Sequence, residues 1–215
     1  ACPRAVIIVA GDSAADALAA NALADPSGLS SQPYLRRTAA ADLLFDPIGG
    51  YSRVDTKSAI VLLTGSARQN YRSLSQPTRY AVKDLRSGGC TTARAAIIVG
   101  GYAAVPVGVD DELISLGYTQ VFRIQGQNRY DTAARVSASL GTSRIPNDVQ
   151  GCAGRSSRIK FYANSVVEYR ASGQECQLLA KTVVLADGIT GADALAAGWW
   201  TSFWQVPVLL HNGTN

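Results

Sequence analysis

The chain repeats one local pattern, in which a short run of apolar residues ends at a turn and is followed by an alanine-rich segment. The first occurrence has its apolar run at 6–9, a Gly-Asp-Ser turn at 11–13 and its alanine-rich segment at 14–24. A continuous apolar run followed by a helix is typical of a parallel sheet, because helices cover both faces of parallel strands. Further strands are expected at 59–63, 95–99, 121–124, 183–185 and 206–210, and further helices at 129–140 and 192–197. The alternation predicts a layered α/β fold.

Two stretches interrupt this alternation. Residues 25–58 form a long excursion that contains three prolines, with a short helix expected near 37–44. Residues 141–181 form a connector that contains two cysteines, and its segment 159–169 has strand-like residues.

The chain has four cysteines and no methionine. An even number of cysteines indicates two disulfides and an oxidising compartment. Cys152 and Cys176 would close a local loop in the connector, and Cys2 would then pair with Cys90; this is one of three possible connectivities. The missing methionine indicates that a signal peptide or a longer precursor segment was removed.

The chain also contains a near-copy of itself. Residues 8–20 align with 184–197, with one residue inserted in the turn, and each copy is followed by an apolar strand, at 60–65 and 207–210. A shared order of strand, turn, helix and strand indicates related modules. Because both ends of the chain fall inside repeat units, the sequence is interpreted as a processed piece of a longer protein.

Four segments carry a family pattern. They are an Ala-Gly turn followed by Asp-Ala-Leu-Ala (10–19), Ile-Val-Gly-Gly (98–101), Arg-Ile-Gln-Gly-Gln-Asn-Arg-Tyr-Asp-Thr-Ala (123–133) and Pro-Val-Leu-Leu (207–210). Together they resemble the bacterial type-2 cell-wall-binding repeat, and the segment at 123–133 is the most specific of them. The resemblance covers residues 4–137 and 182–213 and leaves out the cysteine-bearing connector.

The resemblance implies a Rossmann- or flavodoxin-like parallel sheet with helices on both faces, and non-covalent anchoring of a secreted protein to the cell wall. It also implies an anionic wall glycopolymer as ligand, and modules that occur in threes, packed as a triangle. The chain then divides into a first unit (1–140) with a long insertion (25–58), the disulfide-bearing connector (141–181), and the beginning of a second repeat (182–215). This last segment either starts a new module or completes the first sheet. The first copy departs from the family because it lacks the proline of the Pro-Val-Leu-Leu segment.

Candidate binding residues follow from the motifs and the resemblance. Structural alternatives are capping or a turn hydrogen bond for the aspartates, pairing with Asp131 or a turn carbonyl for Arg129, and core packing for the aromatic residues. The resemblance further implicates the Pro-Val-Leu-Leu segment in binding the polymer. The candidates are Asp16, Arg123, Arg129, Tyr130, Asp193, Pro207, Val208, Leu209 and Leu210.

An esterase is the competing interpretation. The Gly-Asp-Ser turn resembles the nucleophile block of small secreted esterases, so Ser13 would be the nucleophile and His211, the single histidine, its base. Those esterases place an Asp about three residues before the histidine, where this chain has Val208. One histidine and disulfide-prone cysteines also leave no plausible zinc site, and no cofactor is expected.

Charge and hydropathy limit the classes of partner that the chain is expected to bind. The formal charge is +4, which is modest for a nucleic-acid-binding domain. Basic residues concentrate between Arg68 and Arg94, which indicates either a solvated helix face or attraction to an anionic polymer. No apolar run approaches the ~20 residues of a membrane helix.

Overall fold

In the computed structural model, the structure describes residues 2–24, 34–36, 51–53, 56, 58–90, 93–143, 158–161, 167–170, 184–189, 198, 201 and 208–212. The expected short helix near 37–44, the helix at 192–197 and the residues Cys152, Cys176, Asp193 and Pro207 lie outside these ranges.

A four-stranded parallel sheet forms the centre of the molecule, in the order β4-β1-β5-β6. These strands are β1 (Ala5–Ala10), β4 (Ile60–Thr64), β5 (Ala95–Val99) and β6 (Gln120–Ile124). The chain runs from β1 to β4 on one side and then crosses to β5 on the other side. The direction of travel therefore reverses between β1 and β5, as in the doubly wound α/β folds.

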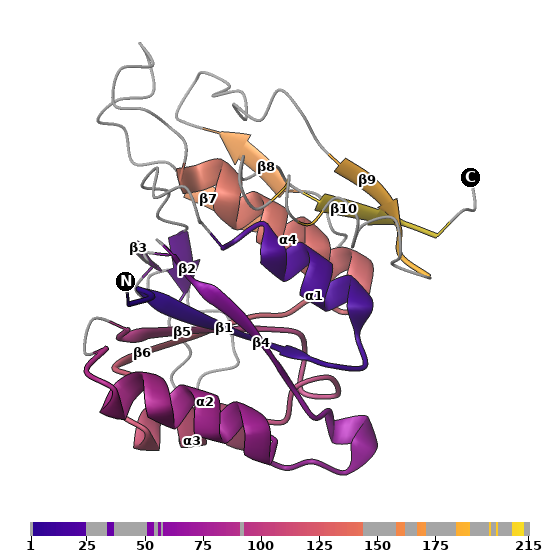
Figure 1. Ribbon diagram of the computed structural model, residues 1–215. Helices are drawn as coiled ribbons and strands as arrows, with labels where there is room; N and C mark the ends of the chain where they lie inside the picture. Colours follow the sequence, from indigo (N-terminus) through magenta and orange to yellow (C-terminus); the bar gives the residue numbers. More distant parts are fainter. Residues whose placement is uncertain are drawn as a thin grey trace.

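Helices cover both faces of this sheet (Figure 1). The first pair, α1 (Ala14–Asn21) and α4 (Arg129–Ser143), packs on one face, and α2 (Gln76–Ser87) and α3 (Gly108–Ser115) pack on the other. The predicted α/β fold with helices on both faces is confirmed. The sequence pattern had not located α3.

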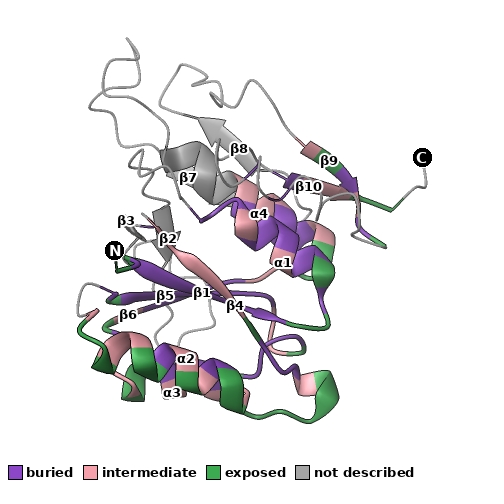
Figure 2. Cartoon of the chain, in the orientation of Figure 1, coloured by how far each residue is buried: buried purple, intermediate pink, exposed green. Residues whose placement is uncertain are grey.

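The apolar run of β1 is buried on both sides, which explains why it is continuous (Figure 2). Because successive side chains of a strand point to opposite faces, Ile7 and Val9 face α1 and α4, whereas Val6 and Ile8 face α2 and α3. By contrast, α2 turns one side to solvent in Figure 2, in keeping with a solvated basic helix face.

A second parallel sheet lies on the far side of α1 and α4 (Figure 1). It pairs β9 (Val184–Asp187) with β10 (Val208–His211), and these strands do not extend the four-stranded sheet. Of the two alternatives for the end of the chain, completion of the first sheet is therefore not what the structure shows. Leu18 of α1 packs against Ala186 and Val208, so α1 is enclosed between the two sheets.

Two antiparallel strand pairs and a short 3-10 helix complete the described elements. Strands β2 (Tyr34–Arg36) and β3 (Tyr51–Arg53) pair antiparallel, as do β7 (Arg158–Phe161) and β8 (Val167–Arg170) in the connector. A short 3-10 helix, η1 (Ala67–Gln69), follows β4. The expected disulfide between Cys2 and Cys90 is present, with their Cα atoms 5.3 Å apart.

Candidate functional site

Parallel strands bring their carboxyl ends to one edge of each sheet, and the starts of α1 and α4 lie at this same edge (Figure 1). Open α/β sheets bind ligands at this edge, where the strand order reverses. We call it the carboxyl edge. The reversal lies between β1 and β5, so the residues that follow these two strands occupy the position where a ligand is expected.

Asp16 occupies this position, in the first turn of α1. Its residue is 5% exposed, and its Oδ2 accepts a hydrogen bond of 2.8 Å from the hydroxyl of Ser13. Within the described part of the chain, Oδ1 has no hydrogen-bond partner. Burial raises the pKa of this carboxyl above its ordinary value of 3.8, although the Ser13 hydrogen bond and the positive charges of Arg129 and Arg68 act in the opposite direction.

Gly100, which directly follows β5, closes the same space. Its φ is +123°, and a Cβ at this position would lie 3.3 Å from Oδ2 of Asp16. Glycine is required here because other residues rarely adopt that backbone conformation and would also crowd the carboxylate.

Two exposed arginines lie near Asp16. Arg68 belongs to η1 and Arg129 begins α4. Arg129 also donates from Nη1 to the carbonyl of Gly188, at 2.9 Å, so it connects the start of α4 to the turn after β9. This hydrogen bond agrees with the structural alternative in which Arg129 bonds a turn carbonyl. The sequence did not indicate that the carbonyl would belong to Gly188.

The start of α4 is built by the most specific of the sequence motifs. The side chain of Asn128 accepts from the amide of Asp131 at 3.0 Å, and Asp131 accepts from the amide of Gln127 at 2.9 Å. Asp131 also pairs with Arg135 at 3.2 Å, and Thr132 accepts from the amide of Gly126 at 3.0 Å. Much of the motif therefore forms the turn and the helix start.

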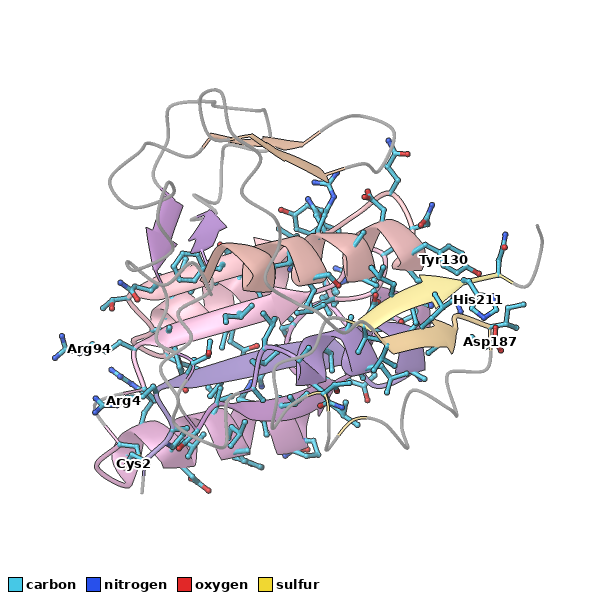
Figure 3. The ribbon with its side chains drawn as sticks, turned by 90° about the horizontal axis from the view of Figure 1, so that it is seen from above. Cys2, Arg4, Arg94, Tyr130, Asp187 and His211 are labelled. Atoms are coloured by element: carbon cyan, nitrogen blue, oxygen red, sulfur yellow. A yellow bond between two sulfur atoms is a disulfide. The ribbon has the colours of Figure 1, made fainter. Side chains whose placement is uncertain are left out.

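The second sheet adds Asp187 and His211 to the carboxyl edge. The two residues are register partners at the ends of β9 and β10. Figure 3 shows their side chains together with that of Tyr130 at one end of the second sheet, with Cys2, Arg4 and Arg94 at the opposite end of the molecule. The sequence pattern placed Asp187 in the turn of the second repeat copy and did not indicate a binding role for it. The signal that would have found Asp187 is the parallel alignment of the two repeat strands.

Arg123 is buried beside Gly100, and its guanidinium is fully engaged by protein groups. Its guanidinium forms an ion pair with Asp110 and donates to the carbonyls of Gly100 (2.8 Å), Val105 (2.9 Å) and Pro106 (3.3 Å). It also stacks on the ring of Tyr102, with its carbon 4.4 Å from the centroid, and its side chain is 0% exposed. These contacts give Arg123 a structural role, because they tie β6 to α3. Its predicted ligand contact stays a prediction.

The apolar strand β10 is partly accessible. Val208 is buried, whereas Leu209 and Leu210 are half-buried. Since Ser137 of α4 donates its hydroxyl to the carbonyl of Val208 at 3.1 Å, the strand is fixed along the helix. Pro207 and Asp193 remain untested predictions, because they lie outside the described residues.

The esterase interpretation gains no support from this geometry. Ser13 is 9% exposed and its hydroxyl donates to Asp16, whereas His211 is exposed at the end of the second sheet. The described residues also contain no group of three or more His, Cys, Asp or Glu side chains arranged to hold a metal ion. None of the helices in the described ranges has the length and apolar character needed to cross a membrane.

Comparison with known proteins finds one family model that matches the C-terminal part of the chain. Residues 123–215, which include α4, β9 and β10, match the family model described as cell wall binding domain 2. The match includes the motif at 123–133 and agrees with the family resemblance that the motifs predicted.

Particular relatives follow from the same comparisons. The chain is 33% identical over 105 residues to the N-acetylmuramoyl-L-alanine amidase LytC of Bacillus subtilis (strain 168), a match that covers 45% of this chain and 19% of the amidase. Among solved structures, Cwp6 from Clostridium difficile matches 98% of the chain and 22% of its own, with a TM-score of 0.57 and 18% identity. Cwp8 from the same organism matches 97% of the chain and 22% of its own, with a TM-score of 0.50 and 20% identity. The chain thus spans about a fifth of each relative, and the two structures support the fold alone.

Proposed function

We propose that this chain is a non-catalytic module of a secreted protein that is associated with the cell wall. The module binds an anionic wall glycopolymer. The observation that carries the proposal is the family match over 123–215, because this segment includes Arg129, Tyr130 and both strands of the second sheet. The amidase activity of LytC is not transferred, since the match covers 19% of that protein.

The charges at the carboxyl edge support an acidic ligand. Arg68 and Arg129 are exposed there, and a guanidinium presents a planar set of donors that suits phosphate or carboxylate groups. The half-buried Leu209 and Leu210 of β10 supply apolar surface nearby, against which the carbon face of a sugar can pack. The edge therefore offers both kinds of contact that an acidic polysaccharide needs.

Retention on purified cell walls tests the proposal. The chain is expected to bind intact Gram-positive walls and to lose binding on the same walls after extraction of their anionic polymers. Binding should also weaken with salt, because exposed charges are screened. Equal retention on extracted walls would contradict recognition of an anionic polymer.

A pair of charge variants locates the binding surface. Arg68→Gln removes one exposed cation at the carboxyl edge and should weaken retention severalfold. Lys83→Gln removes one exposed cation from α2, which covers the face of the four-stranded sheet opposite α1 and α4. This variant should leave retention unchanged. Equal losses in both variants would indicate attraction to net charge without a defined surface.

The triangular arrangement of three modules stays a separate prediction, which sedimentation of the full-length protein can check.

A further inference from the structure

We propose that Asp187 and His211, together with Tyr130, form a subsite that binds paired hydroxyls of a neutral sugar unit in the wall polymer. This inference rests on the proposed function and adds to it the recognition of a neutral sugar beside the acidic groups. It concerns the end of the second sheet, beyond the apolar strand segment that the family resemblance implicated.

The topology places these three side chains together. Asp187 ends β9 and His211 ends β10, and the parallel register makes them direct neighbours. Tyr130 approaches from the start of α4 and packs on Gly188, the residue after Asp187, so that three elements contribute side chains to this end of the second sheet (Figure 3). His211 is exposed, while Asp187 and Tyr130 are half-buried, so a ligand can reach the cluster from solvent.

The backbone under the cluster is held from several sides. The amide of Gly188 donates to the carbonyl of His211 at 2.9 Å, and the carbonyl of Gly188 accepts from Arg129 at 2.9 Å. The ring of Tyr130 packs on the same residue so closely that a Cβ at Gly188 would lie 2.4 Å from Cε1. The amide of Ile189 donates to Oδ1 of Asp187 at 3.0 Å, which orients the carboxylate. A platform fixed in this way loses little conformational entropy on binding.

The chemistry of the cluster suits hydroxyl groups. A carboxylate accepts hydrogen bonds and an imidazole both donates and accepts, so the pair can satisfy two adjacent hydroxyls. Tyr130 offers an aromatic surface, and Leu185 and Ile189, each 66% exposed, add apolar surface on β9 and on the turn that follows it. The carboxylate of Asp187 would repel a phosphate or a second carboxylate, which makes a neutral sugar the better occupant. The acidic groups of the polymer would then be left to Arg68 and Arg129.

Periodate distinguishes contacts to sugar hydroxyls from contacts to acidic groups. It cleaves the carbon–carbon bond between adjacent hydroxyls and leaves phosphate groups in place. The probe is therefore intact Gram-positive walls, untreated or treated with mild periodate. We expect the unaltered chain to bind treated walls about tenfold more weakly, the size expected from losing hydrogen bonds to a charged group.

The variant Asp187→Asn with His211→Gln should bind untreated walls about tenfold more weakly and should no longer respond to periodate. Asn keeps an oxygen for the amide of Ile189, and His211 is exposed, so both changes are compatible with folding. Asp84→Asn on α2 is the matched control, and it should keep both the affinity and the periodate response. A thermal unfolding curve confirms that each variant is folded.

The outcomes distinguish the two proposals. If the unaltered chain binds intact and polymer-extracted walls equally, the proposed function fails. If its binding depends on the polymer but the double variant matches it on untreated walls, or still loses affinity after periodate, the hydroxyl subsite alone is overturned.

Discussion

The buried ion pair between Arg123 and Asp110 joins two elements that are neighbours in space, β6 and α3. Removing one partner of such a pair leaves the other charge buried without its counter-charge, which costs about 3–5 kcal/mol. We therefore expect Asp110→Ala to lower the free energy of unfolding by about that amount in urea denaturation. The matched control is Asp111→Ala, an exposed neighbour in the same first turn of α3, which should change stability by less than about 0.5 kcal/mol. Equal effects at the two positions would show that the ion pair contributes little.

Asp16 makes the stability of the fold depend on pH. Burial raises its native pKa above the unfolded value, so its contribution is fully present below the unfolded pKa and is lost as pH rises through the native pKa. Asp16→Asn removes this charge and keeps an oxygen for the hydroxyl of Ser13. We expect the variant to gain stability relative to the unaltered chain between pH 4 and pH 7, as measured by denaturant unfolding across this range.

The control for this prediction is Asp84→Asn, which changes an exposed carboxylate on α2 and should leave the pH profile unchanged. A stability difference for Asp16→Asn that stays constant from pH 4 to pH 7 would argue against burial as the dominant effect.

At the scale of elements, α1 is enclosed because the two sheets pack against different sides of this helix. Leu18, which is 1% exposed, packs on the second sheet, whereas Leu23, just after the helix, belongs to the core of the four-stranded sheet. Truncating either leucine to alanine should cost about 2–5 kcal/mol. Only Leu18→Ala should lower hydrogen-exchange protection of the amides in β9 and β10 selectively. Equal loss of protection in both sheets would mean that they unfold as one unit.

The elements that sequence predicted best are those whose pattern reflects burial on both faces. The apolar runs of β1 and β5 and the alanine-rich α1 are of this kind, and their bounds differ from the expected ranges by only a few residues. Helix α3 was missed because it carries three acidic residues within eight, so that its apolar side is narrow. The role of Arg123 was missed for the same reason, since its partner Asp110 lies on that helix.

The candidate site was only partly predictable. Asp16, Arg129, Tyr130 and His211 do gather at the carboxyl edge, because repeated strand–helix units bring equivalent ends to one side. The separate pairing of β9 with β10 was not specified locally, since an apolar run does not determine which strand it will join. As a result, the neighbourhood of Asp187 and His211 emerged only from the register of the second sheet.

At the scale of the whole molecule, the disulfide between Cys2 and Cys90 closes a loop with a sequence separation of 88. In the chain-entropy model, a loop of this length stabilises the native state by about 4–5 kcal/mol. The variant Cys2→Ser with Cys90→Ser should therefore unfold at a clearly lower denaturant concentration, and it should retain wall binding because the disulfide lies far from the carboxyl edge (Figure 3).

Adding a reductant to this variant then tests the second predicted disulfide. A further loss of stability is expected if Cys152 and Cys176 are bridged, since the cysteines altered by substitution can no longer respond. An unchanged unfolding curve would contradict the predicted bridge. The variant Cys152→Ser with Cys176→Ser provides the matched control, because reductant then acts on the Cys2–Cys90 bridge alone.

If the variant Cys2→Ser with Cys90→Ser unfolds at the same denaturant concentration as the unaltered chain, the cross-link between the N-terminus and the end of α2 contributes little to stability. The packing of β1 between β4 and β5 would then account for the position of the N-terminus.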